Sequence, residues 1–574
     1  MSVIGLKRAN CKNCYKCLRV CPVKSITFKE DRAEIMPQEC ILCGHCLEAC
    51  PQNAKTLQSD LEKVLKYIAS DAKVIVSLAP SFIGSFSFKK PAQIVTALKK
   101  LGFDAVAETA EGASLVTDEY ARLLAENGQK TAITTCCPTV NNLIEKYYPE
   151  LIPYMLPSIT PMIAHGRLLK KRFGAATKVV FIGPCIAKIE EADDVMHSND
   201  IDAVLTFDEV VHWLEKEGIR PEELEESAFE DAEPGINRMY PITDGIIASL
   251  KQRGGLENRK VMSIDGIDRC IDLFKALKNN ELEPCVIEAN ACKGGCIYGP
   301  AVHGNRTKRF QAAFDIRQYT EEHGCEFPKI DAGIEMHKAF IDKTKTDNIP
   351  DEATIRSILA SIGKDTPDKE QNCGFCGYPS CRDKAIAVYQ KKAKLYMCLP
   401  YMSEMAQSLS NVILAETPNI IIAVDTDMVI QEMNLAAEKA LKTKRYLAVG
   451  RYLYEFIDSS YFELVAQTHE NITDKRVEYP QYDLVTLQNI TYVPDQKIII
   501  GIFYDITKDV EQQDKMYKLR VDTVDMAQNV IDNQMRVAQQ IASLLGETTA
   551  ETKVTLTKLK DMIVYDDDEV GSKS

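Results

Sequence analysis

The sequence predicts a multidomain α/β protein, and three observations lead to that class. Cysteines recur in tight, metal-type spacings in an N-terminal run and again in a later module. Between these modules, short apolar strands alternate with helical patterns, which is typical of a parallel α/β domain. A cysteine-free stretch of α+β character then leads into a long helix. The expected domains are residues 1–65, 66–345, 346–405, 411–510 and 511–574.

Composition limits the partners and the compartment. The chain has 574 residues, 20 cysteines and a net charge of −14, so no overall basic surface favours nucleic acid as a partner. No apolar run approaches a membrane span, and the N-terminus carries no signal-peptide core. Metal-type cysteine spacing in a large chain indicates a reducing compartment. We therefore expect a cytoplasmic protein, from an anaerobic host.

The first module contains one cysteine run twice. Each run has the spacing CxxCxxCxxxCP, which is typical of bacterial two-cluster ferredoxins, in which the fourth cysteine of a run binds the other cluster. A zinc site would need paired CxxC units and does not explain the repeat. The sequence therefore predicts a ferredoxin-like module with two 4Fe-4S clusters that move electrons. One cluster is assigned to Cys11, Cys14, Cys17 and Cys50, and the other to Cys21, Cys40, Cys43 and Cys46.

The central domain is expected to bring cysteines to the ends of parallel strands. Residues 74–78, 132–135 and 179–183 are short apolar strands, and residues 91–103 form an amphipathic helical pattern. Sites in such sheets lie at the carboxyl ends of strands. Cys136 and Cys137 follow the second strand, and Cys185 follows the third. Cys292 and Cys296 come from a third segment, and four thiolates are what a 4Fe-4S cubane needs.

These motifs resemble the signatures of iron–iron hydrogenases. The chain reads TTCCP at 134–138, PCIAKIEE at 184–191 and ACKGGC at 291–296, in the order found in that family. The resemblance covers roughly residues 1–300. It implies an H-cluster, in which a cubane is bridged through one cysteine to a diiron subsite with CO, CN and a dithiolate bridge. The implied cubane ligands are Cys137, Cys185, Cys292 and Cys296, with Cys296 as the bridge.

The resemblance also implies roles around the cluster. Lys188 matches the lysine that hydrogen-bonds a cyanide ligand, and Pro80 and Ser81 match residues that contact the other cyanide. Cys136 matches the thiol that carries protons to the bridging amine. The alternative interpretations are a solvated surface lysine for Lys188 and a buried inert thiol for Cys136. The implied reaction is reversible heterolytic conversion of H2 into protons and electrons.

The chain departs from the catalytic members of that family along the proton relay and around the diiron pocket. Glu119 can be placed on one relay position, but the other relay positions carry Val116 or Arg122, and Leu156, which cuts the usual chain. Glu119 or Glu191 is an alternative proton route. We interpret the changes as slow turnover at a tuned metal centre. The positions altered in the pocket are Met162, Gly183 and Asn290.

A second iron–sulfur module is expected after a charged linker at 346–370. Its cysteine spacing, CxxCxxxxC followed after 16 residues by a fourth cysteine, resembles the small 4Fe-4S domain of electron-transfer and corrinoid-reducing proteins, with a zinc site as the alternative. Residues 382–397 are expected to be helical. Cys270, Cys285 and Cys325 fit no motif and are expected to be free buried thiols. The expected ligands are Cys373, Cys376, Cys381 and Cys398.

The C-terminal part resembles a sensor. A VDTDMVI start at 424–430, an Asn434 cap and a GIFYDIT strand at 501–507 resemble a PAS domain, with a generic α+β accessory domain as the alternative. His469 is expected at its surface. Heptad-like spacing from Tyr517 to Leu545 favours a coiled coil, hence a homodimer or a partner helix, or else a helix packed on the PAS domain. Residues 566–569 are expected to belong to a disordered acidic tail.

Three functions remain open at this point. The first is a sensory hydrogenase that passes a redox signal to the PAS domain and from there to a downstream signalling protein. The second is an ordinary bidirectional hydrogenase that exchanges electrons with a ferredoxin-type partner. The third is a non-catalytic protein resembling iron–sulfur assembly factors, which keep the cubane cysteines without the diiron subsite.

Overall fold

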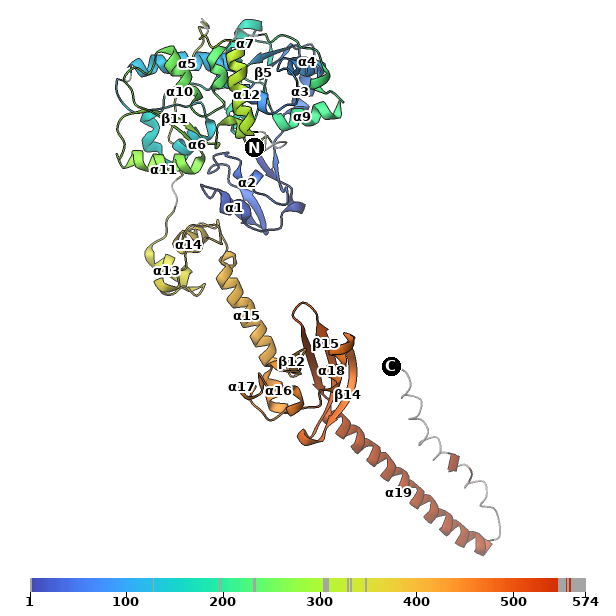
Figure 1. Cartoon of the computed structure of the whole chain (residues 1–574). Coiled ribbons are helices and arrows are strands. Elements are labelled where there is room, and N and C mark those ends of the chain that lie inside the picture. The colour runs from blue at the N-terminus through green and yellow to red at the C-terminus, as the bar shows by residue number, and fades with distance from the viewer. Residues whose placement is uncertain are drawn as a thin grey trace. The chain divides into compact units, whose positions relative to one another are not determined.

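A computed structural model gives the fold, which divides into two compact units, Met1–Tyr401 and Met402–Ser574. Figure 1 shows the order of the elements along the chain. Each unit is described by itself. The residues described are 3–126, 128–195, 197, 199–230, 234–302, 309–327, 330, 333–345, 348–545, 554, 557 and 558.

The N-terminal module is built from short strands and two short helices, and each helix lies within a cysteine run and carries its third cysteine. Two antiparallel pairs, β1 with β4 and β2 with β3, enclose the cysteine loops. Tyr15 and Gly44 precede the two helices with left-handed backbone conformations, so each helix starts at a sharp turn. The elements are β1 (Ile4–Leu6), α1 (Lys16–Val20), β2 (Ile26–Lys29), β3 (Arg32–Ile35), α2 (His45–Glu48) and β4 (Lys55–Leu57).

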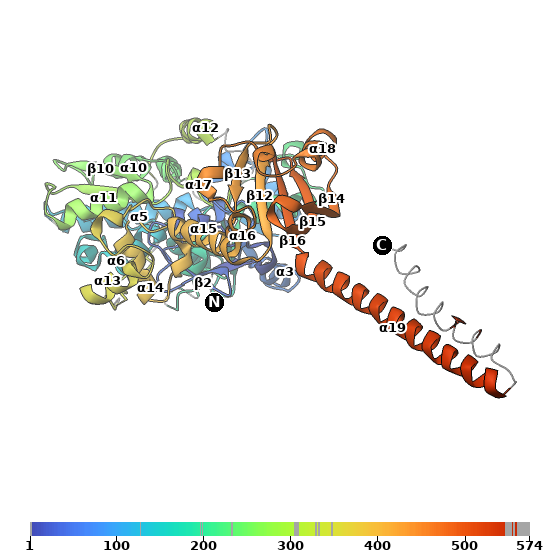
Figure 2. The ribbon, with the colours of Figure 1, turned by 90° about the horizontal axis from the view of Figure 1, so that it is seen from below.

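The central domain contains two parallel sheets, as the sequence predicts. One has the strand order β6-β5-β8-β9 and the other β10-β11-β7. Figure 2 shows β10 with α10 and α11 beside it. The elements are α3 (Leu61–Ile68), β5 (Val74–Leu78), α4 (Gln93–Lys100), β6 (Ala105–Glu108), α5 (Ala110–Glu126), β7 (Ala132–Ile133), α6 (Pro138–Tyr147), α7 (Pro161–Phe173), β8 (Lys178–Gly183), α8 (Ala187–Ala192), β9 (Ala203–Thr206), α9 (Phe207–Lys216), α10 (Gly245–Arg253), β10 (Val261–Asp265), α11 (Ile267–Lys278), β11 (Val286–Asn290) and α12 (Arg309–Glu322).

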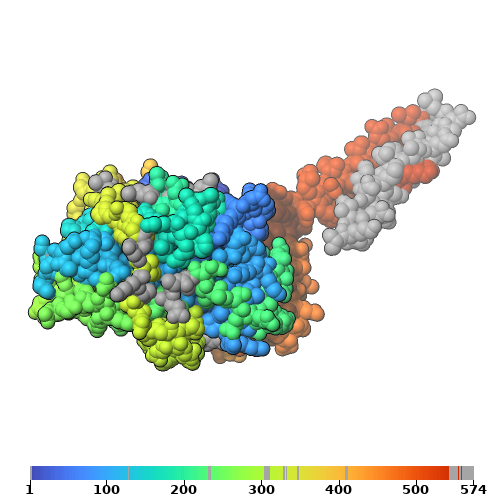
Figure 3. Space-filling model, turned by 90° about the horizontal axis from the view of Figure 1, so that it is seen from above, coloured from blue at the N-terminus to red at the C-terminus, as the bar shows by residue number. Residues whose placement is uncertain are grey.

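Complete burial of strands β5, β6, β9 and β11 explains why this part of the sequence folds as parallel sheets. All five residues of β5 are buried, which is typical of a strand covered by helices on both faces. Helices α5 and α7 pack so closely that a Cβ at Gly112 would lie 2.3 Å from the carbonyl oxygen of Pro161. Figure 3 shows one face of this domain, on which segments far apart in the sequence lie side by side.

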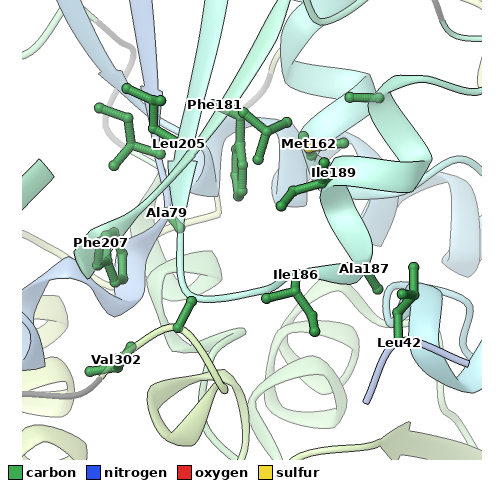
Figure 4. Close-up of a cluster of buried hydrophobic side chains, with 14 of the residues drawn as sticks. Leu42, Ala79, Met162, Phe181, Ile186, Ala187, Ile189, Leu205, Phe207 and Val302 are labelled. Atoms are coloured by element: carbon green, nitrogen blue, oxygen red, sulfur yellow. The ribbon is translucent and has the colours of Figure 1, made fainter. Parts of the chain in front are cut away.

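The ferredoxin-like module packs directly on the central domain. Figure 4 shows Leu42 entering the same group of buried side chains as Ile186 and Ala187. The hydroxyl of Tyr147 donates to the carbonyl oxygen of Glu39 at 2.6 Å, and Lys146 Nζ donates to the carbonyl oxygen of Cys40 at 2.6 Å. The loop that carries Cys40 and Cys43 is therefore fixed against helix α6.

The segment predicted to be a linker at 346–370 contains a helix, so that prediction is wrong. Helix α13 (Glu352–Ala360) starts where Asp351 accepts a hydrogen bond from the Thr354 amide, and its apolar face packs on α14 (Cys381–Tyr389). The helix predicted at 382–397 is shorter than expected. It ends at Tyr389, and Lys391 has a positive φ of 60° that breaks the helical path.

The second unit contains one antiparallel sheet and a long helix. Its strand order is β13-β12-β16-β15-β14, with helices between the second and third strands of the chain order. Helix α15 (Leu399–Glu416) leads from the cysteine module into this unit. The acidic residues 566–569 lie outside the described residues. The elements are β12 (Ile420–Asp425), β13 (Ile430–Met433), α16 (Leu435–Ala440), α17 (Arg445–Ala448), α18 (Ser460–Thr468), β14 (Ile472–Tyr479), β15 (Leu484–Val493), β16 (Ile498–Asp505) and α19 (Thr507–Leu545).

In the part of the chain that the structure describes, no helix combines the length and apolar character needed to span a bilayer.

Candidate active site

The ends of strands from both sheets converge on one buried cavity. Strand β7 leads to Cys136 and Cys137 at the start of α6, β8 leads to Cys185, and β11 leads to Cys292. We call the four predicted cubane ligands that line this cavity the central site. Its free volume is about 90 Å³, which exceeds what one water molecule needs. The central site consists of Cys137, Cys185, Cys292 and Cys296.

A polar atom without a protein partner faces this cavity. Pro80 and Ser81 line it from the short 3-10 helix (Pro80–Gly84) that follows β5. Ser81 is buried, and its Oγ has no hydrogen-bond partner among the described residues. A buried hydroxyl without a partner costs free energy, so Ser81 fits a cavity that receives a polar group.

Lys188 is not a solvated surface lysine. Its side chain is 13% exposed and lies at the same cavity. Its Nζ lies 3.3 Å from Glu191 Oε2 and 3.4 Å from Thr160 Oγ1. Burial alone would lower the pKa of Lys188, but the negative charge of Glu191 outweighs it and holds that pKa above its ordinary value. A fixed cation therefore faces the cavity.

Cys136 lies at the same cavity and contacts the hydroxyl of Tyr120. The Sγ–Oη distance is 3.2 Å. Burial raises the pKa of Cys136 to about 12, so the group is a neutral thiol at neutral pH. The Tyr120 hydroxyl also accepts a hydrogen bond from the Thr135 amide at 2.8 Å, which fixes its position beside the thiol. The arrangement holds one exchangeable proton at Cys136 Sγ.

The altered positions have structural consequences. A Cβ at Gly183 would lie 2.6 Å from the ring of Phe181, so no larger residue fits there with this ring in place. Phe181, Met162 and Asn290 line the cavity instead. Both Val116 and Leu156 are buried and apolar, so neither can move a proton.

The sequence suggested Glu119 as an alternative proton route. In the structure, Glu119 forms an ion pair near the surface. Glu119 Oε1 lies 2.6 Å from Arg122 Nη2 in α5. Glu191, the other acidic residue considered, binds Lys188 and lies 3.6 Å from Lys338. Both carboxylates are thus paired with cations.

The sequence analysis missed Glu288, a buried carboxyl group close to the cavity. Glu288 accepts hydrogen bonds from the Asp244 and Ile247 amides, each at 3.1 Å, and from Asn290 Nδ2 at 3.1 Å. Burial raises its pKa to about 7 despite these donors. The signal in the sequence was a lone acidic residue inside the fully buried strand β11.

The remaining twelve predicted ligands form three further groups, and each group lines a small cavity of its own. Among the described residues, no three His, Cys, Asp or Glu side chains are grouped tightly enough for a single metal ion. We call the groups the outer ferredoxin site, the inner ferredoxin site and the small-module site. They are, in that order, Cys11, Cys14, Cys17 and Cys50; Cys21, Cys40, Cys43 and Cys46; and Cys373, Cys376, Cys381 and Cys398.

The donor set of the central site fits a cationic cluster. Burial raises the pKa of Cys185 to about 11 and also raises the pKa values of Cys137 and Cys292. Thiolates in such a cavity need a positive partner, which a bound metal cluster supplies.

The three cysteines outside the motifs differ in their surroundings. Cys270 and Cys285 are buried, as expected, whereas Cys325 is exposed, so the expectation of a buried thiol is wrong there. Cys325 follows the end of α12, where the chain has already left the core.

Comparison with known proteins finds matches for all three cysteine-containing parts of the chain. Residues 72–300 match the family described as iron only hydrogenase large subunit, C-terminal domain, residues 4–51 match a 4Fe-4S dicluster domain, and residues 370–400 match a putative Fe-S cluster family. These matches place the cysteine-rich parts among iron–sulfur cluster domains. More particularly, the chain combines a region similar to the iron-only hydrogenase large-subunit family with one similar to a 4Fe-4S dicluster domain.

Individual relatives are more distant. Iron hydrogenase 1 of Clostridium pasteurianum is 29% identical over 287 residues, which is 40% of this chain and 50% of that protein. The cytosolic Fe-S cluster assembly factor NAR1 of Yarrowia lipolytica is 30% identical over 134 residues, which is 20% of this chain and 27% of that protein. This chain thus spans half or less of the length of these relatives. A solved variant of FeFe-hydrogenase HydA1 from Chlamydomonas reinhardtii covers 50% of this chain and all of that structure, at 18% identity and a TM-score of 0.40.

Proposed function

We propose that the protein is a sensory iron–iron hydrogenase that reacts slowly and reversibly with H2. One observation carries the proposal. A single buried cavity is lined by the four converging cysteines of the central site, and also by the Cys136 thiol, the Lys188 cation and the unpartnered Ser81 hydroxyl.

These residues fit the H-cluster of the hydrogenase family. The four cysteines would hold the cubane, with Cys296 as the bridge to a diiron subsite carrying CO, CN and a dithiolate bridge. Lys188 and Ser81, together with Pro80, would contact the cyanide ligands. When bound, this cluster supplies the redox chemistry that splits H2 into protons and electrons.

The protein's own residues control the surroundings of that chemistry. The mostly apolar cavity wall excludes water, which strengthens the field of the Lys188 ammonium inside it. Cys136 holds a proton at Sγ and releases or accepts it at the cavity wall. Tyr120 orients that thiol from its fixed position on α5.

Slow turnover follows from the lost relay. Val116 and Leu156 cannot carry protons, and Glu119 is held by Arg122, so protons leave Cys136 by a less direct route. A metal centre that turns over slowly suits sensing, because its redox state then follows the H2 concentration rather than the rate of electron flow.

The second unit supplies the sensor part of the proposal. Its five-stranded antiparallel order, in which the unit's first strand β12 lies between β13 and the last strand β16, supports a PAS domain at 411–510. Core residues such as Phe462 and Phe503 fill its interior. We propose that redox changes pass from the small-module site, which ends at Cys398, into α15 and this domain, and that a downstream signalling protein reads them.

Infrared spectroscopy of anaerobically matured, full-length protein tests the function. We expect metal-bound CO and CN bands that shift under H2, with low H2 turnover using a dye. Absence of these bands, after a maturation procedure that works on a control hydrogenase, would contradict the proposal. Fast turnover with a ferredoxin-type partner would favour a bidirectional hydrogenase instead.

An assembly-type function is the second candidate, because one relative is named as a cytosolic Fe-S cluster assembly factor. Cubane signals without CO and CN bands would favour this function. Retention of Cys136, Lys188 and Ser81 at one cavity argues against it.

A further inference from the structure

The small-module site lies close to the inner ferredoxin site, although more than 300 residues separate them in the sequence. The module packs on the ferredoxin-like module through Tyr378, Met397 and neighbouring apolar side chains, which share a buried cluster with Leu18. The approach is close, because a Cβ at Gly377 would lie 2.9 Å from Leu18 Cγ. Gly377 has a φ of 94°, which favours glycine at this contact.

Polar contacts fix the same interface. Lys392 Nζ lies 2.9 Å from Glu39 Oε2, with side chains 14% and 8% exposed. The hydroxyl of Tyr396 donates to Asp31 Oδ1 at 2.6 Å, and Arg19 Nη1 donates to the Phe375 carbonyl oxygen at 3.3 Å. Because both side chains are largely buried, loss of either partner would leave an uncompensated buried charge at this interface.

Tyr378 lies between the two groups of cysteines. It lines the small-module cavity, and together with Cys21 it lines a neighbouring groove. Cys376 lines the first of these cavities and Cys21 the second, so Tyr378 borders a cysteine of each group. Tyr378 is 4% exposed, and its hydroxyl has no hydrogen-bond partner among the described residues. A buried hydroxyl of this kind fits a donor aimed at a cluster thiolate.

The inner ferredoxin site also faces the central site. Cys43 and Leu42 line the central cavity together with its cysteines. A Cβ at Gly44 would lie 2.3 Å from Pro300 Cβ, so the two loops are in direct contact. On its remaining side the inner site borders the outer site, where Cys17 acts electrostatically on Cys46.

We propose that the inner ferredoxin site is a branch point for electrons. One electron at a time passes from its cluster either to the outer site or, past Cys21, Tyr378 and Cys376, to the small-module site. Tyr378 is a positioning residue that donates a hydrogen bond to a cysteine sulfur of one of these two clusters. The inference rests on the proposed function only in assuming that the cysteine groups hold 4Fe-4S clusters. In this scheme electrons reach the sensor part through the small-module site, and they leave for an external electron carrier through the outer site.

Redox titration of the full-length protein, followed by electron paramagnetic resonance with dithionite as the reductant, tests the role of Tyr378. Hydrogen bonds to cluster sulfurs raise reduction potentials. Tyr378→Phe should therefore shift one of the two neighbouring clusters to a more negative potential and leave the others unchanged. Tyr389→Phe, an exposed tyrosine of the same module, is the matched control and should shift none. Unchanged potentials in both variants would overturn this role.

The branch itself is tested by magnetic coupling and by rapid mixing. Reduction of the inner cluster should broaden the signal of the small-module cluster. Lys392→Glu, which sets two carboxylates against each other, should remove this broadening and slow reduction of the small-module cluster alone. Lys369→Glu breaks only a pair with Asp365 inside the module and should change neither property. Equal slowing of the outer cluster in Lys392→Glu, or no coupling in the unaltered protein, would overturn the branch.

Failure of the proposed function would be seen separately. Iron analysis establishes whether the clusters are present, and the dithionite titration does not need the diiron subsite. Missing CO and CN bands together with coupled ferredoxin and small-module clusters would reject the hydrogenase proposal and retain the branch.

Discussion

The thiol of Cys136 lies 3.2 Å from the hydroxyl of Tyr120, and the Thr135 amide donates to the same hydroxyl at 2.8 Å. Because the hydroxyl already accepts this bond, its own proton is available to the thiol sulfur or to Thr135 Oγ1. The position of the thiol, in the loop after β7, therefore depends on a residue of helix α5.

We expect Tyr120→Phe to lower H2 turnover while leaving the infrared bands of a matured protein in place. Loss of one hydrogen bond of about 1 kcal/mol corresponds to roughly a fivefold effect. Dye-coupled H2 oxidation measures it. Tyr482→Phe removes a comparable hydroxyl that bonds the Phe456 carbonyl oxygen in the second unit, and its turnover should be unchanged. Full turnover in Tyr120→Phe would contradict a role for this contact.

Glu288 is the best-placed carboxyl group to relay protons. Its pKa of about 7 lets it exchange protons at neutral pH, and its partner Asp244 is exposed. Tyr240 and Cys136 line the cavity, and Glu288 acts electrostatically on both. In H2 oxidation the carboxylate must accept a proton, so turnover should rise as pH increases through about 7.

Glu288→Gln should lower turnover by about 100-fold, the typical size of a proton-transfer contribution, and should flatten this pH profile. Glu119→Gln tests the route suggested by the sequence and should change turnover little, because Glu119 is paired with Arg122. If Glu119→Gln lowers turnover more than Glu288→Gln does, the proton route runs through Glu119 in α5.

The sequence predicted the cysteine groups because ligand spacing is local and specific. The structure brings each predicted set to one cavity, including the exchange of Cys21 and Cys50 between the two runs. Parallel strands were also predictable from continuous apolar runs. Glu288 was not, because its raised pKa depends on burial between β11 and the start of α10, which are distant in sequence. Helix α13 was missed because its charged surface masked two apolar positions, Ile355 and Leu359.

A buried ion pair stabilises the central domain. Arg238 Nη2 lies 2.7 Å from Glu108 Oε1, and both side chains are almost completely buried. Arg238→Met leaves a buried carboxylate without its cation, which should cost about 3–5 kcal/mol of unfolding free energy. Denaturation followed by fluorescence of Trp213, the single tryptophan, reports on this domain.

A double variant measures the interaction free energy between Arg238 and Glu108 apart from the contacts that each makes with its surroundings. Glu108→Gln combined with Arg238→Met should be less destabilised than the sum of the single variants, because no unpaired charge remains. Arg220→Met breaks an exposed pair with Glu223 and should cost about 0–1 kcal/mol. Additive losses in the double variant would show that the two groups do not interact.

The stability of the same domain should fall between pH 7 and pH 5. Burial lowers the pKa of His165 below its ordinary value of 6.5, so the unfolded chain takes up a proton in this range before the folded one does. Stability is therefore present above pH 6.5 and is lost as pH falls toward the folded pKa. Glu111 contributes no change here. Burial would raise its pKa, but His165 and Arg172 hold it below 4.5, so its contribution is lost only at lower pH.

Thermal unfolding of the full chain, followed at Trp213 between pH 5 and pH 7, checks this window. His165→Asn should flatten the dependence, whereas His212→Asn, at an exposed histidine in α9, should leave it unchanged. The same slope in His165→Asn as in the unaltered protein would assign the dependence to another group.

Helix α19 presents apolar side chains to solvent along most of its length. Tyr517, Val521, Val530 and Ile541 are all more than 40% exposed. Burying these side chains favours association, and the seven-residue spacing of Tyr517, Val524 and Ile531 favours a second copy of the same helix. We therefore expect a homodimer formed through α19.

Val524→Asp combined with Ile531→Asp should convert the dimer into a monomer, because two charges would be buried in the shared seam of the helices. Light scattering coupled to gel filtration of the full-length protein measures the mass. Asn529→Asp adds a charge on a different face of the same helix and should preserve the dimer. If the unaltered protein is a monomer at every concentration, the exposed apolar face belongs to the interface with a different protein, and signal output then depends on that partner rather than on pairing of two sensor chains.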